Sequence, residues 1–488
     1  MVQMNDDRRP AVFSTKPHWV QAVLRSAVVW ACGLAAAGAQ AATTGLTEAP
    51  DAPPAVVAPA VAPADAASAP RPVSSSAQQL YEQARHQLVQ VRTLLSGQGS
   101  QSTVGSGFFV GSGGLIVTNY HVVSQVALQP QRYRLTYAGA DGREGALDLL
   151  AFDAAHDLAV VRPVQAPRPA IEGLTVRPRQ ASLDKGERIY SLGNPLDVGF
   201  AVVEGTYNGL VERDFYPTIF FSGSLNPGMS GGPALDSQGQ VMGVNVATRL
   251  DGQQVSFLVP SDFLQDLLAR ATKATPIRQP AYAELTRQLM VHQDGLTKRF
   301  MAQSWRSAGH PSYRIPVPQE TFMRCWGSSS QPHAKGIEFE RSDCNMNQSV
   351  FVSGGLNTGN LSVRHEIYDG SKLGAWRFAR QHSLSFRNEF VGGGRQRTAA
   401  QCSERFVQHD GLDMRAVLCM SAYKKLPGLY DLSVLVATLN ADTAGVQGRF
   451  DARGVGFDNA LKLADFYLKG YGWTPAPKTA ATVTPASR

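Results

Sequence analysis

Three separated segments of the chain hold the side chains that serine-based hydrolysis needs. They are TNYHVV with His121, AHDLAVV with Asp157, and NPGMSGGPAL with Ser230. This chemistry uses a hydroxyl as nucleophile, an imidazole that takes its proton, and an acid that holds the imidazole. The sequence therefore predicts a triad in the chain order His, Asp, Ser, provided that the fold brings the three segments together.

The glycines around Ser230 also fit a second class of hydrolase. Residues 228–232, GMSGG, satisfy the G-x-S-x-G elbow of α/β hydrolases, in which the serine is the first triad member and a helix follows it. Here Ser230 comes last, and a turn-like DSQG leads into QVMGVNV, which has the pattern of a strand. The order and the context both disfavour an esterase or lipase fold.

The elements that must position these segments are mostly short strands. Residues 103–247 alternate β-rich runs with Gly-containing turns, which predicts a barrel or sandwich. We expect His121 at the end of a β-hairpin and Asp157 at the start of an apolar strand. An amphipathic helix over 77–95, preceded by capping serines, and a Ser-capped helix over 261–271 are expected to flank the strands.

Residues 104 to about 268 resemble the trypsin-like serine proteases of the HtrA (Deg) type. The resemblance depends on GSGFFVGSGGLIVTNYHVV, DAAHDLAVVR, a GNP tripeptide, GMSGGP and a closing SFLVPSDF. It implies a mainly β catalytic domain with a chymotrypsin-like double β-barrel. It also makes His121 the general base, Asp157 its orienting acid and Ser230 the nucleophile, with the backbone amides of Gly228 and Ser230 as oxyanion donors.

Substrate preference is less clearly encoded. The position six residues before the nucleophile is Ser224, and the wall strand of the substrate pocket is expected to pass through Asn245, Val246 and Ala247. None of these residues provides an acidic floor for a Lys or Arg side chain. We therefore expect cleavage after small or medium apolar residues.

Other ionisable side chains near Asp157 are expected to be structural. His156 would project to the opposite side of a strand from Asp157. Asp153 lies four residues before the position that the family pattern selects, and Asp148 precedes an apolar pair in the preceding strand. Asp157 therefore remains the predicted acid.

The chain begins with the pattern of an export signal. Basic residues precede the apolar run SAVVWACGLAAAG, and Ala39 and Ala41 are small residues placed as at a signal-peptidase cut. We expect a signal peptide over 1–41 and an exported protein, periplasmic or secreted, with no stable membrane span after cleavage. An uncleaved anchor, a lipidated Cys32 and twin-arginine export are the weaker alternatives. Residues 42–76, rich in Ala and Pro, are predicted to be a disordered linker.

The overall composition limits the other classes of function. Of 488 residues, 43% are hydrophobic, and a net charge of +7 is spread over the whole length. These values disfavour a wholly disordered chain, and they give little support to nucleic-acid binding. No apolar run predicts a polytopic membrane protein.

The catalytic domain is expected to span 77–275, and an α+β domain of unknown role is expected over 276–474 with a flexible tail over 475–488. Two cysteine-bounded segments of the second domain each have the pattern strand, loop, strand, which suggests a diverged repeat. The other expected elements are helices near 281–305 and 457–470 and strands at 349–352, 361–368 and 432–439.

Four cysteines lie in this second domain. An even number in an exported chain favours disulfides, and three pairings exist. We prefer Cys325 with Cys344 and Cys402 with Cys419, because both separations suit cross-strand pairs beside a turn.

No metal ion or organic cofactor is predicted. A zinc site that combines cysteines with His333 or His409 is the alternative, but the sequence has no C-x-x-C or paired-ligand spacing. GVGF at 454–457 matches the carboxylate-binding loop of a PDZ domain, yet too few residues follow it for such a domain. We therefore expect no PDZ domain.

These observations predict an exported serine endopeptidase that hydrolyses protein or peptide substrates through an acyl-enzyme intermediate. The alternative is a catalytically inactive trypsin-like scaffold that acts as a binding protein in the envelope or outside the cell. A third hypothesis is that the C-terminal region is an adaptor or inhibitor for the protease.

Overall fold

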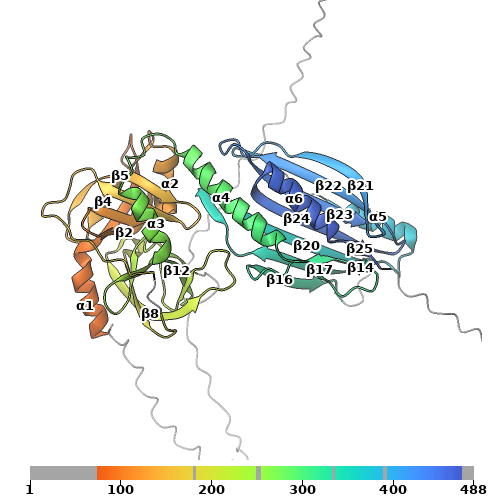
Figure 1. Ribbon diagram of the computed structural model, residues 1–488, viewed down its shortest axis with the longest axis horizontal. Helices are drawn as coiled ribbons and strands as arrows, with labels where there is room; N and C mark the ends of the chain where they lie inside the picture. The colour runs from red at the N-terminus through yellow and green to blue at the C-terminus, as the bar shows by residue number, and fades with distance from the viewer. Residues whose placement is uncertain (1–73, 180–182, 249–253, 332–335, 388–392, 475–488) are drawn as a thin grey trace, which may run out of the picture. The chain divides into compact units, whose positions relative to one another are not determined.

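The structure is a computed structural model of the chain (Figure 1). The expected signal peptide, most of the linker, His333 and the expected tail lie outside the described residues. The described ranges are 74–179, 183–248, 254–331, 336–387 and 393–474.

Two closed antiparallel barrels of six strands each form the first part of the described chain (Figure 1). This confirms the predicted double β-barrel. The first barrel has the order β1-β2-β3-β6-β5-β4, and the second has the order β10-β11-β12-β9-β8-β7. The strands are β1 (Leu88–Leu95), β2 (Gln101–Val110), β3 (Leu115–Thr118), β4 (Tyr133–Gly139), β5 (Glu144–Asp153), β6 (Leu158–Pro163), β7 (Arg188–Gly193), β8 (Ala201–Leu210), β9 (Ile219–Phe221), β10 (Pro233–Leu235), β11 (Val241–Thr248) and β12 (Ser256–Pro260).

The helix predicted over 77–95 is wrong in its second half. Helix α1 (Ser75–Ala84) ends where a 3₁₀ turn begins, and β1 follows. The predicted serine cap is present, because Ser74 accepts a hydrogen bond from the amide of Ala77. Residues 88–95 pair with both β2 and β4, and their β-branched side chains Val89, Val91 and Thr93 are buried. Tertiary strand pairing therefore overrides the helical spacing of the apolar residues.

Two further helices complete the barrel region. Helix α2 (Tyr120–Leu128) follows the β2–β3 hairpin, so His121 lies in the first turn of a helix and not in the hairpin itself. Helix α3 (Ser261–Ala271) has the predicted bounds, but its N-cap residue is Pro260 and no side chain caps it. The predicted serine cap of α3 is therefore wrong.

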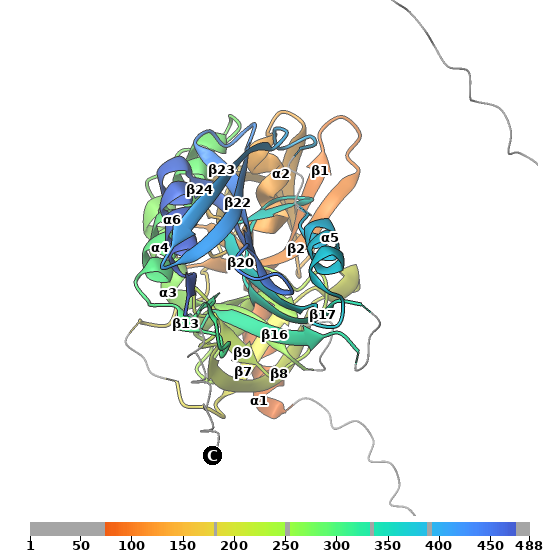
Figure 2. The same ribbon diagram turned by 90° about the vertical axis from the view of Figure 1, so that its right-hand side faces the viewer.

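The C-terminal region is α+β, as predicted, and consists of a seven-stranded antiparallel sheet with helices. Helix α6 (Phe457–Lys469) and helix α4 (Tyr282–Met301) pack on one face, and α5 (Ala375–Ser385) lies against the other face (Figure 2). The sheet order is β16-β17-β20-β24-β23-β22-β21. Its strands are β16 (Met323–Ser329), β17 (Glu338–Met346), β20 (Asn360–Asp369), β21 (Gln401–His409), β22 (Leu412–Ala422), β23 (Leu429–Thr438) and β24 (Ala444–Gly456).

Three small two-stranded sheets accompany the large one. The hairpin β18–β19 interrupts the path from β17 to β20. GVGF at 454–457 spans the end of β24 and the start of α6, so it is a strand-to-helix junction. The short strands are β13 (Arg306–Ser307) with β15 (Pro316–Val317), β14 (Tyr313–Arg314) with β25 (Gly472–Trp473), and β18 (Val350–Ser353) with β19 (Leu356–Thr358).

The two disulfides of the described region lie at opposite edges of the seven-stranded sheet. Cys325 and Cys344 are directly opposite in the β16–β17 pair, and they are bonded. Cys402 and Cys419 occupy the same relation in the β21–β22 pair at the other edge. Each edge pair is thus covalently joined.

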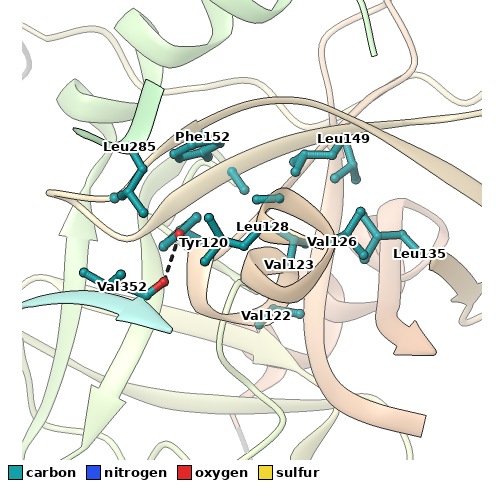
Figure 3. Packing of buried hydrophobic residues seen from close by; sticks show 14 of the residues in the cluster. Tyr120, Val122, Val123, Val126, Leu128, Leu135, Leu149, Phe152, Leu285 and Val352 are labelled. Atoms are coloured by element: carbon teal, nitrogen blue, oxygen red, sulfur yellow. Dashed lines mark hydrogen bonds between the residues drawn. The ribbon is translucent and has the colours of Figure 1, made fainter. Parts of the chain in front are cut away.

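The catalytic and C-terminal regions share a hydrophobic core. One cluster combines Val123 of α2 and Leu149 of the first barrel with Leu285 of α4 and Val352 of β18. The hydroxyl of Tyr120 also donates a hydrogen bond of 3.0 Å to the carbonyl of Val352 (Figure 3). The change of architecture near residue 275 is therefore not a break in packing. None of the described helices combines the length and apolar character that a membrane span requires.

Candidate active site

Asp157 holds His121 at two points. One carboxylate oxygen lies 2.6 Å from Nδ1 of the imidazole, and the other accepts a 2.8 Å hydrogen bond from the backbone amide of His121. The first contact fixes the tautomer, because Nδ1 must carry a proton to donate to a carboxylate. It leaves Nε2 of His121 as the nitrogen able to accept a proton.

The backbone of Asp157 is held as firmly as its side chain. Its φ is 54°, in the left-handed region, where a residue other than glycine costs on the order of 1–3 kcal/mol. Its carbonyl accepts hydrogen bonds from the side chain of Asn119 at 2.7 Å and from the amide of Tyr120 at 3.2 Å. The turn before β6 and the start of α2 are therefore joined by four hydrogen bonds that involve Asp157.

The surroundings of His121 favour its protonated form. Burial lowers the pKa of this imidazole, but the negative charge of Asp157 and the hydrogen bond to it raise the pKa to a value above 6.5 overall. The ring of Phe351, from β18 in the C-terminal region, lies edge-on with its centroid 6.2 Å from that of His121. An imidazolium formed here is thus stabilised by one fixed anion.

The loop that holds Ser230 packs against the segment leading into His121. The carbonyl of Ser230 accepts a 2.7 Å hydrogen bond from the backbone amide of Ser106 on β2. Gly231 follows with a φ of 87°, and a Cβ there would clash with the backbone of Ser106 and lie 2.9 Å from the amide of Asn119. Only glycine allows this approach, which brings Ser230 next to the residues just before His121.

The hydroxyl of Ser230 forms its hydrogen bond with a backbone carbonyl. Its Oγ donates a 3.4 Å hydrogen bond to the carbonyl of Val246, and within the described ranges no hydrogen bond joins Ser230 to His121. Such contacts are often loose in structures without substrate. The pair of His121 and Asp157 is therefore formed, whereas the contact of Ser230 with His121 is not.

Two backbone amides at the Ser230 loop have no partner among the described residues. The amides of Met229 and Gly231 are used in hydrogen bonds within the fold, but those of Gly228 and Ser230 donate to none of the described residues. Gly228 has a φ of 96°, and a Cβ there would clash with the carbonyl of Asn194. Donors of this kind can stabilise an oxyanion.

Ser106 was not predicted from the sequence, although it fixes this loop. Its hydroxyl donates to the carbonyl of Gly228 at 2.7 Å and accepts from the amide of Asn194 at 2.8 Å. It therefore links the GNP tripeptide to Gly228, at the start of the loop that holds Ser230. No motif indicates this role, because a serine within a strand is ordinarily unremarkable.

The residues predicted to shape specificity have different environments. Ser224 is exposed, and Val246 is the extra residue at a β-bulge in which Asn245 faces Leu258 and Ala247 faces Phe257. Bulges of this kind occur next to active sites.

Asn245, predicted to lie on the wall strand of the substrate pocket, uses its side chain within the fold. This side chain is fully buried, accepts a hydrogen bond from Ser191 and donates to the carbonyls of Leu192 and Met229. It therefore supports the Ser230 loop from beneath.

The rival ionisable residues have other partners. Asp153 lies 2.9 Å from Nδ1 of His156, and Asp148 lies 2.8 Å from Arg278. His156 sits in the turn before β6, so its separation from the triad comes from its bond to Asp153 and not from strand alternation.

The structure offers no support for the zinc alternative. All four cysteine sulfurs form disulfides, and Nδ1 of His409 lies 2.9 Å from the carbonyl of Tyr471. In the part of the chain that the structure describes, no cluster of three or more His, Cys, Asp or Glu side chains could hold a metal ion.

Known proteins are similar to the part of the chain that holds these residues. Residues 105–244 match the family model of the trypsin-like peptidase domain. Protease Do-like 1, chloroplastic, from Arabidopsis thaliana is 29% identical over 187 residues, which are 36% of this chain and 41% of that protein. The "Probable periplasmic serine endoprotease DegP-like" of Hahella chejuensis is 33% identical over 178 residues, 35% of this chain and 36% of that protein. The crystal structure of the serine endoprotease from Yersinia pestis aligns over 41% of this chain and 68% of that one, with 23% identity and a TM-score of 0.35.

Residues 105–244, which lie within the two barrels, are therefore similar to the trypsin-like peptidase domain. The relatives of the chain are Do- and DegP-like serine proteases, which confirms the resemblance to the HtrA (Deg) type. The chain spans well under half the length of these curated relatives.

Proposed function

We propose that the chain is an exported serine endopeptidase that cleaves protein substrates through an acyl-enzyme intermediate. The observation that carries this proposal is the double hold of Asp157 on His121, beside a loop in which the amides of Gly228 and Ser230 donate to none of the described residues. A structural serine would need neither an imidazole in a fixed tautomer nor unused donors beside it.

The proposed reaction begins when Ser230 turns from Val246 toward His121. Oγ of Ser230 attacks the scissile carbonyl while Nε2 of His121 takes the hydroxyl proton. The amides of Gly228 and Ser230 bind the resulting oxyanion, and each such donor typically contributes about 3 kcal/mol to transition-state stabilisation.

The intermediate then breaks down in two steps. The C–N bond breaks, and His121 gives its proton to the leaving amine, which leaves an ester on Ser230. Water attacks this ester while His121 takes a proton from the water. The bond between the carbonyl carbon and Oγ of Ser230 then breaks as His121 returns the proton to Oγ, which gives a carboxylic acid and the free hydroxyl. Asp157 remains ionised throughout and balances the imidazolium.

Location and substrates follow from the sequence and the relatives. The predicted signal over 1–41 and the periplasmic name of the Hahella relative support export to the periplasm or beyond. The protease names of the relatives support polypeptide substrates.

A fluorophosphonate probe tests the proposal, because only an activated serine reacts with it. The full chain should be used, since the C-terminal region shares a core with α2. We expect covalent labelling of the wild-type protein, mapped to Ser230 by mass spectrometry, and none in Ser230→Ala. Labelling that is equal in Ser230→Ala, or absent from the folded wild-type protein, would favour the inactive scaffold instead.

A further inference from the structure

A large cavity lies directly beside the candidate active site. Its volume is about 810 Å³, and its lining includes Asp157 and Val246, the residues that contact His121 and Ser230. Its lining includes neither Ser230 nor Gly228. A substrate side chain bound in it would therefore belong to a residue some distance along the peptide from the bond that is cut.

Residues of the barrel region and of the C-terminal region both line this cavity. The second barrel and α3 contribute aromatic rings, including Phe257 and Phe263, and the C-terminal region contributes Trp326, Met346 and Val350. Cavities of this size with apolar and aromatic walls are typical of ligand sites.

Hydrogen bonds fix the contact between the two walls. Gln348 donates to the carbonyl of Tyr216 and accepts from its amide, both at 3.0 Å. The hydroxyl of Tyr216 lies 3.0 Å from Nδ1 of His292, whose Nε2 lies 2.8 Å from the carbonyl of Gly359. The cavity is therefore preformed and does not require closure by a substrate.

The disulfide between Cys325 and Cys344 holds the outer wall. Arg324 and Trp326 flank Cys325 on β16, and Met346 lies two residues after Cys344 on β17. The bond thus joins the two strands at the point where they border the cavity.

Trp326 and two arginines give the opening a distinct chemistry. The Trp326 side chain remains 63% exposed, and the Arg324 guanidinium lies 5.0 Å from its ring centre. Arg213 also lines the cavity, and neither arginine forms an ion pair with another described residue. An apolar side chain could cover the exposed ring, and a neighbouring carboxylate could pair with the arginines.

We propose that this cavity binds an aromatic or large aliphatic side chain of the polypeptide substrate, with an acidic residue next to it, and that Trp326 determines this preference. The inference rests on the proposed function, because it assigns the cavity to the same cleft. It gives the C-terminal region a role in substrate selection.

Peptide binding to the full-length Ser230→Ala protein tests this without cleavage. The probes are fluorescein-labelled decapeptides of Ala and Ser with one Phe beside one Glu, and the same peptides with Ala in place of Phe. Fluorescence anisotropy should show about ten-fold tighter binding of the Phe peptides. Adding Trp326→Ala should remove most of this preference.

Trp376→Ala is the matched control. Trp376 on α5 is 91% exposed and does not line the cavity, so its replacement should leave the Phe preference unchanged. Equal binding of Phe and Ala peptides, or a preference that survives Trp326→Ala, would overturn the proposal.

The two disulfides allow a second comparison between a test variant and its control. Replacing Cys325 and Cys344 by Ser should weaken the Phe preference, whereas the same change at Cys402 and Cys419, at the far edge of the sheet, should not. Equal loss in both double variants would contradict a specific role for the first disulfide in holding the cavity wall.

A charge exchange tests the arginines. Replacing the Glu beside Phe by Lys should weaken binding several-fold, and Arg324→Gln should reduce the difference between the two peptides. Equal affinity of the Glu and Lys peptides would overturn the acidic preference.

Fluorophosphonate labelling of the wild-type protein separates the two proposals. If Ser230 is labelled but the Phe preference does not depend on Trp326, the proposed peptidase activity stands and the proposed role of the cavity is wrong. A Trp326-dependent preference without labelling would retain a peptide-binding cavity on an inactive scaffold.

Discussion

Two histidine–aspartate pairs lie within a few residues of each other, and the histidine of one pair, His121, follows the segment that packs against the Ser230 loop. Asp157 holds His121 at 2.6 Å, and Asp153 holds His156 at 2.9 Å, in both cases through Nδ1. The two carboxylates are also almost equally exposed, at 19% and 18%. The hydrogen bond between acid and base therefore does not distinguish a candidate catalytic pair from a structural one.

The second nitrogen of each ring makes the difference. Nε2 of His156 is buried and has no hydrogen-bond partner among the described residues. The ring of His156 is stacked on Phe263 at a centroid distance of 3.8 Å. The side chain of His121 is 32% exposed, against 15% for His156, and it lies beside the Ser230 loop. A base needs a free lone pair that a substrate can reach, and only His121 has one.

Replacing each aspartate by asparagine should give the largest difference in activity between the two pairs. Asp157→Asn should lower kcat/KM about 10³–10⁴-fold, because the amide no longer stabilises the imidazolium and can favour the wrong tautomer. Asp153→Asn should lower it less than about ten-fold, since only packing near the site changes. The measurement is peptide hydrolysis at neutral pH, and similar losses in the two variants would refute the assignment of roles.

The pH dependence should follow His121 alone. Because Asp157 raises the pKa of His121 above 6.5 and the base must be neutral, kcat/KM should fall as the pH drops through a value above 6.5. In Asp157→Asn this limb should move to lower pH, since the raising charge is gone.

Asp153→Asn is the control for this pH experiment. Its acid limb should match that of the wild-type protein. A limb that moves in Asp153→Asn and not in Asp157→Asn would reverse the two roles. Residual activity in Asp157→Asn can be followed by the rate of fluorophosphonate labelling.

Asp153 is expected to contribute to the stability of the folded protein. Burial raises the pKa of Asp153, but the hydrogen bonds and charge of His156 and the charge of Arg270 lower it below 3.8 overall. A lowered folded-state pKa stabilises the protein at neutral pH, and this stabilisation is lost as the pH falls through about 4 and below.

Asp153→Asn should accordingly reduce the free energy of unfolding by about 1–3 kcal/mol at pH 7 and by less near pH 3. Urea unfolding at the two pH values, followed by circular dichroism, measures this. An equal loss at both pH values would show that the charge of Asp153 does not contribute.

Local strand patterns predicted a barrel or sandwich, and the resemblance to HtrA-type proteases implied the two barrels that the structure has. The three site segments were indicated by local motifs. The sequence was not sufficient where contacts between distant segments determine the secondary structure or the position of a side chain. The 77–95 segment has helical spacing, yet β1 forms there because β2 and β4 provide its hydrogen bonds. Asn245 was expected to line the pocket, but its side chain satisfies buried carbonyls of other elements.

The contributions of the C-terminal region to the site could not be predicted for the same reason. Phe351 and Trp326 reach the cleft through a hairpin and an edge strand that no family pattern describes. Their positions depend on the core shared with α2 and on the hydrogen bonds of Gln348.

The aromatic neighbours of the two rings provide the smallest and most specific test of the comparison. Phe351 lies edge-on to His121 and Phe263 is stacked on His156, so Leu at either position keeps apolar volume and removes a ring contact. Such contacts contribute about 0.5–1.5 kcal/mol. Phe351→Leu should slow fluorophosphonate labelling about two- to five-fold with little change in stability, because it removes the ring contact with the imidazole of His121. Phe263→Leu should leave the labelling rate unchanged and reduce the free energy of unfolding by about 1 kcal/mol. Slower labelling in Phe263→Leu alone would mean that the His156 pair, and not Phe351, transmits packing to the active site.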